Sequence, residues 1–376
     1  MANFSEDIKS KSTERIYFPE LDGLRFLAFF MVFIVHHSLF SSIPFLSFLS
    51  ANGWIGVDLF FVLSAFLFTK LLIAEHEKTG TISFMKFYIR RIFRIWPIYF
   101  IMIGFSVAVF ALAKHEPLDA IAKTRIIGLL TFSDNIMAAI YSGFNHLPFS
   151  FHLWTIGYEE QFYVIIPVII LLLVRSSPKV KVITFISTIV VLNAIRIWFL
   201  EDKVPYPAIY VLPITHFEAI IFGIAIGFGG FSFLKKFSPI LIGATGIIFF
   251  ALLCILPNVE FIISYWQVVS YFCVGMSTAL ILYAVLSSDK LKSFFSHKIL
   301  VFLGKRSYGL YVYHLFGIKM VDALAPRISA FATNAYLTFI CSMLLTILLS
   351  VASYHFIEKP FLVLKKRFEI ITSRPV

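Results

Sequence analysis

The chain has 376 residues, of which 59% are hydrophobic, only 14% are charged and 45 are phenylalanine. A soluble chain of this length would form about two domains, and this one is too apolar for that class. Its net charge of +11 would suit a nucleic-acid-binding protein, but the distribution of the charge argues against that class.

Apolar windows with few or no charges recur along the chain, each long enough to cross a hydrocarbon core of about 30 Å as a helix. We therefore predict an all-α fold: a polytopic membrane bundle of about ten transmembrane helices. The predicted spans are residues 24–40, 53–73, 97–113, 153–174, 182–200, 212–231, 239–256, 265–287, 308–325 and 334–355. One domain is predicted over 1–376, with a tail at about 1–20, the bundle at 21–357 and a second tail at 358–376.

The basic residues indicate how the bundle lies in the membrane. With the N-terminus inside, cytoplasmic segments hold 24 of the 32 Lys and Arg, external segments hold six, and Arg25 and Arg196 fall within spans. Such a bias is what the positive-inside rule predicts. Both termini are therefore expected in the cytoplasm, the bilayer is the expected partner, and no nucleic-acid partner is predicted.

The first predicted span carries Arg25 and His36, eleven residues apart. Eleven steps of 100° return nearly to the starting direction, so both side chains leave one face of the helix, about 16 Å apart along its axis. Arg25 is expected at the cytoplasmic edge and His36 toward the outer leaflet, whereas His37 is turned off that face. Histidine is a common acid/base group, whereas Arg25 by itself would also suit a snorkelling anchor.

The next candidates lie in the second span and in the cytoplasmic segment that follows it. Asp58 and Ser64 point to different sides of their helix. Each also has a structural interpretation: Ser64 as a small residue that allows close helix packing, and Asp58 as an interfacial cap. Residues 76–96 include the amphipathic SFMKFYIRRIFRIWP, which favours an interfacial helix ending at Pro97. Arg91 and Arg94 share a face of it, as phosphate ligands or as a headgroup anchor.

Further ionisable groups lie in later spans, where they are costly and by default mark function. His152 and Glu159 in HLWTIGYEEQFY are seven residues apart and share a face. One glutamate of the pair Glu159 and Glu160 is expected in an aqueous cavity open to the outside. His216 and Glu218 lie near the outer end of the sixth span. His314 in the ninth is expected near the cytoplasmic half, where it equally suits a core histidine. We treat Asp58, Ser64, His152, Glu218 and His314 as acceptor-side or structural polar residues.

Six segments in order resemble the acyltransferase 3 family of bacterial membrane acyltransferases. They are LDGLRFLAFF with its following histidine, GVDLFFVLSAFL, RRIFRIWP, HLWTIGYEEQFY, SYGLYVYHLF and HFIEKPF, spread over the whole chain. The resemblance implies transfer of an acyl group, most often acetyl, from cytoplasmic acyl-CoA to an extracytoplasmic acceptor, typically a sugar of a cell-surface polysaccharide. It also implies a multi-pass protein of the bacterial cytoplasmic membrane, in a form without an appended soluble domain.

The resemblance also assigns roles to residues. Arg25 and His36 match the family's defining arginine and histidine, Arg91 and Arg94 its arginine motif, and Glu159 its glutamate. Two positions depart from the family pattern: Ala65 replaces a usual glycine, and His216 replaces a common arginine, which puts anion binding there in doubt. We expect Arg25, Arg91 and Arg94 to bind acyl-CoA, and His36 to act as the base with Glu159 orienting it. An acyl-histidine intermediate is an open alternative.

Two other classes of protein also place ionisable residues inside a membrane bundle: a transporter or proton relay, and a haem protein. A transporter or proton relay would use the same intramembrane His, Glu and Arg, but predicts inverted repeats, which the sequence does not display. A haem site would need stacked histidine pairs on two helices, whereas His36, His152, His216 and His314 come from four predicted helices. No bound cofactor or metal is predicted, since Cys254, Cys273 and Cys341 lack metal-ligand spacing and suit ordinary buried thiols.

Overall fold

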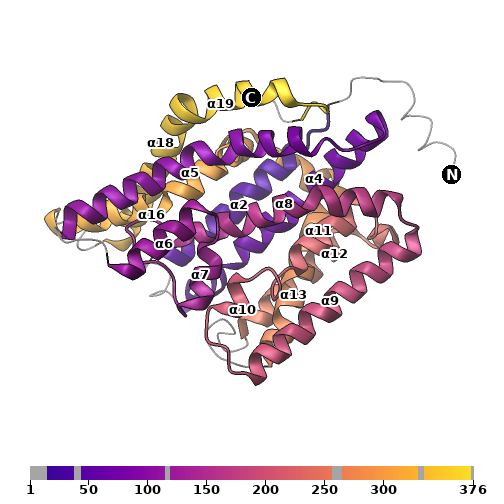
Figure 1. Cartoon of the computed structure of the whole chain (residues 1–376), viewed down its shortest axis with the longest axis horizontal. Helices are drawn as coiled ribbons and strands as arrows, with labels where there is room; N and C mark the ends of the chain where they lie inside the picture. Colours follow the sequence, from indigo (N-terminus) through magenta and orange to yellow (C-terminus); the bar gives the residue numbers. More distant parts are fainter. Residues whose placement is uncertain (1–14, 38–43, 115–118, 256–264, 329–333, 374–376) are drawn as a thin grey trace.

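The computed structural model describes residues 15–37, 44–114, 119–255, 265–328 and 334–373, and these residues form helices with no strand among them. The predicted all-α class is therefore confirmed. Figure 1 shows the helices packed into one bundle, with α2 and α4 running through its interior.

The helices of seven or more residues are α2 (Pro19–His36), α3 (Pro44–Asn52), α4 (Ile55–Thr79), α5 (Phe84–Lys114), α6 (Ala120–Leu130), α7 (Asp134–Ile140), α8 (Trp154–Arg175), α9 (Pro178–Glu201), α11 (Glu218–Gly227), α12 (Pro239–Ile255), α13 (Trp266–Ser287), α14 (Asp289–Phe295), α15 (Lys298–Lys305), α16 (Ser307–Leu324), α18 (Ala335–Ser353) and α19 (Lys359–Lys365). Shorter turns are η2 (Phe151–Leu153), α10 (Ala208–Val211), η3 (Ser232–Lys236), η4 (Ala325–Arg327), η5 (Tyr354–Glu358) and η6 (Lys366–Phe368).

Six helical segments of the described chain are long and apolar enough to cross a membrane. They are Ile55–Thr79, Phe84–Leu112, Phe151–Arg175, Pro178–Glu201, Trp266–Ser287 and Ala335–Phe368. The other four predicted spans coincide with α2, α11, α12 and α16, which are shorter or carry more charge. The class of membrane protein is thus supported, whereas the count of ten and the cytoplasmic position of the termini stay predictions.

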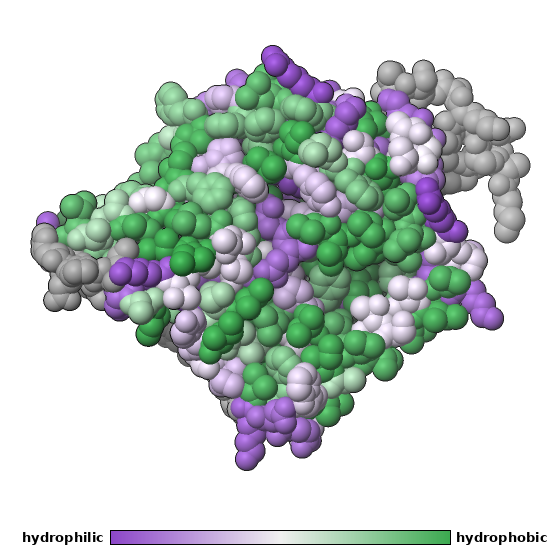
Figure 2. All heavy atoms as spheres, in the orientation of Figure 1, coloured by the Kyte–Doolittle hydropathy of each residue, from purple (hydrophilic) through white to green (hydrophobic). Residues whose placement is uncertain are grey.

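The surface carries the lipid-facing side chains that such a protein needs. Only 11% of the α9 window is buried, and exposed apolar residues such as Val182, Ile186 and Val190 run along that helix. Figure 2 shows hydrophobic residues spread over the visible face, with the most hydrophilic residues gathered at its extremities. Hydrocarbon around this surface would leave most of the charged side chains at the two membrane interfaces.

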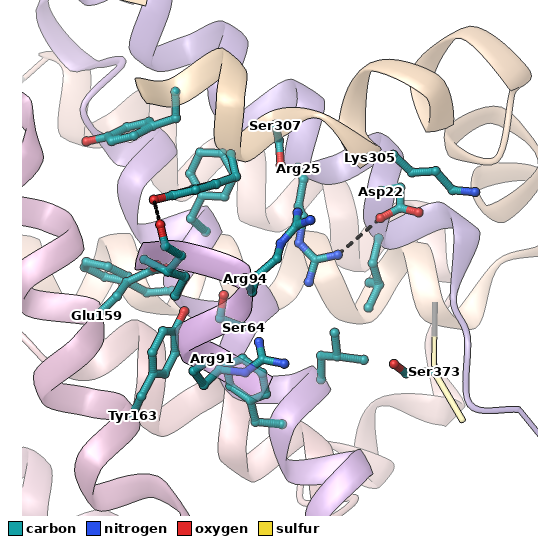
Figure 3. Close-up of a pocket in the computed structure, with 18 of the residues that line it drawn as sticks. Asp22, Arg25, Ser64, Arg91, Arg94, Glu159, Tyr163, Lys305, Ser307 and Ser373 are labelled. Atoms are coloured by element: carbon teal, nitrogen blue, oxygen red, sulfur yellow. Dashed lines mark hydrogen bonds and ion pairs between the residues drawn. The ribbon is translucent and has the colours of Figure 1, made fainter. Parts of the chain in front are cut away.

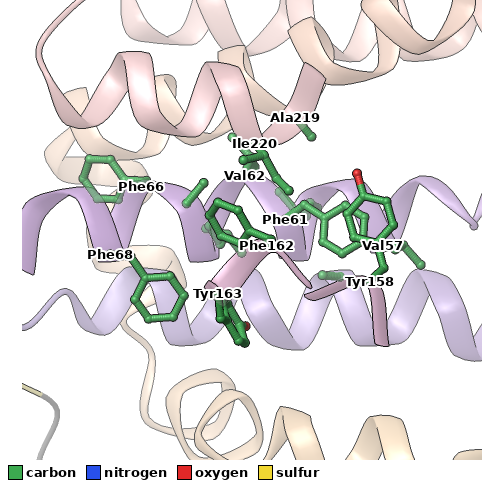
Figure 4. Close-up of a cluster of buried hydrophobic side chains, with 14 of the residues drawn as sticks. Val57, Phe61, Val62, Phe66, Phe68, Tyr158, Phe162, Tyr163, Ala219 and Ile220 are labelled. Atoms are coloured by element: carbon green, nitrogen blue, oxygen red, sulfur yellow. The ribbon is translucent and has the colours of Figure 1, made fainter. Parts of the chain in front are cut away.

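The core is built around α4, which packs against α2 and α8 and also against α11 and α13. Phe61 of α4 stacks on Tyr158 of α8 with ring centroids 4.5 Å apart, and Val62 lies between them and Ile220 of α11 (Figure 4). A second buried group, Phe29, Phe33, Leu310 and Ile318, joins α2 to α16. These contacts fix α2, and with it both of its ionisable residues, relative to the rest of the bundle.

Two glycines allow the start of α2 to approach its neighbours closely. A Cβ on Gly304 of α15 would lie 1.7 Å from the carbonyl oxygen of Asp22, and one on Gly23 would lie 2.1 Å from that of Phe295. Both opposing atoms belong to the backbone, which cannot move aside as a flexible side chain would. The position of the first turn of α2, one turn before Arg25, therefore depends on these glycines.

The segment around Pro97 differs from its prediction. Instead of an interfacial helix that ends at Pro97, α5 continues through it from Phe84 to Lys114. Proline removes one intrahelical hydrogen bond, but the surrounding residues Ile95, Ile98 and Tyr99 are buried against other helices. Tertiary packing therefore outweighs the local break, and Arg91 and Arg94 lie on the same continuous helix as the candidate span Phe84–Leu112.

Gly304→Ala should destabilise the fold by about 1–3 kcal/mol or more, because the new methyl group must displace the backbone of α2. The matched control is Gly104→Ala in α5, where a Cβ would meet no atom within 4 Å and helix propensity should slightly favour alanine. The measurement is the free energy of unfolding in detergent micelles by titration with SDS. Equal stability of the two variants would contradict the close approach.

Candidate functional site

A cavity opens among α2, α4, α5, α8, α16 and the chain's two terminal segments, with about 1420 Å³ of unfilled space including the part open to solvent. Its polar lining includes Asp22, Arg25, Ser64, Arg91, Arg94, Thr155, Glu159, Tyr163, Lys305, Tyr311 and Lys365. Figure 3 shows Arg25, Arg91 and Arg94 coming together in it, with Glu159 and Tyr163 to one side. The structure thus brings together five candidate residues from four helices: Arg25, Ser64, Arg91, Arg94 and Glu159.

The lining holds an excess of positive charge. Five lining side chains are basic and only two, Asp22 and Glu159, are acidic. Charged groups at membrane depth are costly unless they are paired or face water. An anion of several charges would therefore be favoured in this cavity.

The first of these cations is oriented by its own helix. Nη1 of Arg25 lies 3.2 Å from a carboxylate oxygen of Asp22, and the Tyr17 hydroxyl donates to the other oxygen at 2.8 Å. Asp22 is 1% exposed, so this carboxylate is fixed by burial as well as by its two partners. Arg25 is thus directed into the cavity, whereas a snorkelling anchor would point to the headgroups.

The two arginines of α5 are held in different ways. Arg94 lies 3.6 Å from Glu358, in the segment between α18 and α19. The guanidinium of Arg91 lies 4.6 Å from the ring centroid of Phe68 and 5.8 Å from that of Phe87. Aromatic faces attract a guanidinium without neutralising it, so neither ring compensates the charge of Arg91.

Two lysines of the cavity escaped the sequence analysis. Lys365 of α19 is 7% exposed and lies 3.4 Å from Glu369, while Lys305 of α15 lies over the Tyr17 ring at 5.6 Å. Lys365 follows the recognised segment HFIEKPF, and Lys305 precedes SYGLYVYHLF. Their place in the cavity depends on the terminal segments, which pair through the backbone between Ile16 and Thr372 at 2.9 Å.

Glu159 lies at the arginine end of the site. It interacts electrostatically with Arg25 and Arg91 and lies against Tyr163, one turn further along α8. The printed hydrogen-bond partners of the His36 ring are Val32 and His314. That Glu159 orients His36 therefore stays a prediction, and so does a cavity open to the outside.

Three histidines from separate elements meet beyond the inner end of the cavity. The ring of His314 in α16 lies 4.9 Å from that of His36 in α2 and 4.7 Å from that of His152 in η2. His314 and His152 are almost fully buried, whereas His36 is half-buried. His314 is therefore level with His36, contrary to its predicted place near the cytoplasmic half. His37 packs against Phe33 and Phe339, away from this group, as predicted.

Hydrogen bonds define which nitrogen of neutral His36 is basic. Nδ1 of His314 lies 2.5 Å from the carbonyl oxygen of Tyr311 and must carry the proton, so its Nε2 accepts. That Nε2 lies 3.1 Å from Nδ1 of His36, which also faces the carbonyl oxygen of Val32 at 2.9 Å. Nδ1 of His36 is therefore the donor, and its Nε2 keeps a lone pair. Among the described residues, His314 holds the place next to His36 that was expected for Glu159.

Asp58 and Glu218 lie elsewhere, in a buried network of ion pairs. Asp58 of α4 accepts from His216 at 2.8 Å, and Glu218 of α11 pairs with Arg196 of α9. All four side chains are at most 2% exposed, and none lines the cavity. These pairs link helices and do not contribute to the cavity. His216, noted above as a departure from the family pattern, hydrogen-bonds to Asp58.

In the part of the chain that the structure describes, no group of three His, Cys, Asp or Glu has an arrangement that could hold a metal ion. Cys273 and Cys341 are half-buried free thiols, and the side chain of Cys254 is outside the described residues.

This geometry defines a class of protein: a helical membrane protein with a cationic cavity next to a group of histidines. The chain belongs to the acyltransferase 3 family: the family model, described as "Acyltransferase domain", matches residues 18–355. The resemblance drawn from the six sequence segments is thereby confirmed.

Curated relatives include proteins of Staphylococcus aureus. The chain is 28% identical to the O-acetyltransferase OatA of strain NCTC 8325 over 96% of its own length, and 28% identical to a "Putative O-acetyltransferase" of strain COL over 92%. The matches cover 59% and 57% of those proteins, so the chain spans less than two thirds of their length. No solved structure matches the chain.

Glu218→Gln should destabilise the protein by roughly 3–5 kcal/mol, because it leaves the fully buried Arg196 without its counter-charge. The control is Asp289→Asn, whose pairing with Lys292 is exposed and whose loss should change stability by less than about 0.5 kcal/mol. Unfolding by SDS titration in micelles measures both variants. A tolerant Glu218→Gln would show that the network contributes little to the fold.

Proposed function

We propose that this protein is an O-acyltransferase of the bacterial cytoplasmic membrane. It takes an acyl group, acetyl by default, from cytoplasmic acyl-CoA and transfers it to a hydroxyl of an extracytoplasmic acceptor. The acceptor is a sugar of a cell-surface polysaccharide such as O-antigen, capsule or exopolysaccharide. The observation that carries the proposal is a cationic cavity, in a member of an acyltransferase family, that is lined by the terminal segments and by Tyr311, whose ring contacts His314 next to His36.

The donor is held by charge at one end of the cavity. CoA carries several phosphate charges, and the cavity offers Arg25, Arg91 and Arg94 together with Lys305 and Lys365. Guanidinium groups bind phosphate oxygens in a bidentate way. The pantetheine arm then runs along α2 past Ser64 toward the histidines, and the thioester lies near His36.

The acceptor hydroxyl is activated by His36. Nε2 of His36 takes the hydroxyl proton as the oxygen attacks the thioester carbon, and returns it to the sulfur when the C–S bond breaks. His314 is a positioning residue, because its Nε2 accepts from Nδ1 of His36 and so keeps the basic nitrogen available. This direct route needs no acyl-enzyme, although an acyl-histidine could form at the same nitrogen.

His36→Ala should abolish acyl transfer while leaving protein level and binding of acetyl-CoA unchanged, because only the base is removed. Membranes are given labelled acetyl-CoA, and label is measured in surface polysaccharide. The control His355→Ala alters an exposed histidine and should retain activity. Transfer by His36→Ala would refute the assignment of the base, and uptake of label without covalent transfer would favour a transporter.

Arg91→Ala should weaken acetyl-CoA binding by roughly 10- to 100-fold, since a hydrogen bond to a charged group contributes about 1.5–3 kcal/mol. Binding to the purified protein is measured by isothermal titration calorimetry. The matched control, Arg175→Ala, removes an exposed arginine outside the cavity. If both variants bind like the wild type, the cavity is not the donor site.

A further inference from the structure

The cavity ends at two hydroxyl groups that the mechanism above does not use. Thr155 in the first turn of α8 and Tyr311 of α16 both line the cavity and are 6% and 7% exposed. Their hydroxyl oxygens lie 2.6 Å apart. We propose that the Tyr311 hydroxyl is the hydrogen-bond donor that stabilises the oxyanion of the acyl-transfer intermediate, with Thr155 as its positioning residue. This inference rests on the proposed function.

The location of Tyr311 suits this role. Its ring lies 5.2 Å from that of His152 and 5.6 Å from that of His314, and His314 contacts His36. Tyr311 is also one helical turn before His314 on α16. A thioester that enters along the cavity therefore meets the Tyr311 hydroxyl, on a residue whose ring contacts two of the three histidines.

The hydrogen bonds around Tyr311 leave a donor available when charge develops. Both hydroxyls lie 3.1 Å from one acceptor, the carbonyl oxygen of His152. That carbonyl can be satisfied by either of them. When an oxyanion forms in the cavity, Thr155 donates to the His152 carbonyl oxygen, and the Tyr311 hydroxyl is free to donate to the oxyanion.

The step balances in atoms and charge. The acceptor oxygen forms a bond to the thioester carbon while Nε2 of His36 takes its proton, and the carbonyl π electrons move to the carbonyl oxygen. Tyr311 donates to that oxygen without losing its proton. The electrons then re-form the C=O bond, the C–S bond breaks, and His36 returns the proton to the thiolate.

The competing role for Tyr311 is a mere barrier between the cavity and the histidines. A barrier depends on the ring, whereas an oxyanion donor depends on the O–H group. Tyr311→Phe keeps the ring and removes only the hydroxyl, so it separates the two roles. Removing one oxyanion donor typically lowers kcat by about 10²–10³.

The experiment uses the purified full chain in liposomes with labelled acetyl-CoA and surface polysaccharide from the native host. Tyr311→Phe should lower kcat by about 10²–10³ with KM for acetyl-CoA nearly unchanged. The matched control is Tyr313→Phe on the same helix, whose hydroxyl bonds to Ser353 at 3.1 Å outside the cavity. Thr155→Ser, which keeps a hydroxyl, should lose less kcat than Thr155→Val.

The outcomes separate this inference from the function on which it rests. If the wild type transfers no label to polysaccharide, the proposed function is wrong. If the wild type transfers label and Tyr311→Phe matches Tyr313→Phe, the function holds and the oxyanion role is wrong. A wild-type kcat for Tyr311→Phe together with a changed kcat for Tyr311→Ala, which removes the ring, would assign the barrier role instead.

Discussion

An excess of basic side chains around one cavity of a membrane bundle is the constraint on which this structure depends. Five basic side chains and two acidic ones line the cavity, and Arg94 and Lys365 also pair with Glu358 and Glu369. Hydrocarbon cannot solvate charge that is neither paired nor facing water. Elsewhere the bundle neutralises its buried charges one by one, as Arg196 with Glu218 and His216 with Asp58. The contrast separates a part of the molecule that holds helices together from a part prepared for an anion.

Helix α2 connects that anion-binding end to the chemistry. It carries Arg25 at the cavity and His36 among the histidines, and its first turn is held by close backbone contacts at Gly23 and Gly304. The length of helix between the two side chains is about 16 Å, which sets the distance between charge recognition and reaction. A shift of α2 would disturb both at once.

Helix periodicity allowed prediction of much of the site, because Arg25 and His36, or Arg91 and Arg94, share a face within one helix. The all-α class followed from apolar windows alone. Contacts between helices have no such local signal: the contact of His36 with His314, the interaction of Glu159 with Arg25 and Arg91 and the entry of Lys365 into the cavity depend on tertiary packing. The predicted helix end at Pro97 was wrong for the same reason, because packing outweighed the local helix break.

The most direct test of the account is a cryo-electron microscopy structure of the protein with CoA bound. The account predicts CoA in the cavity, with its phosphate groups within ion-pair distance of Arg91 and Arg94 and its thiol directed toward Thr155, Tyr311 and the histidines. CoA bound outside the cavity, or with its thiol at the end near the chain termini, would contradict it.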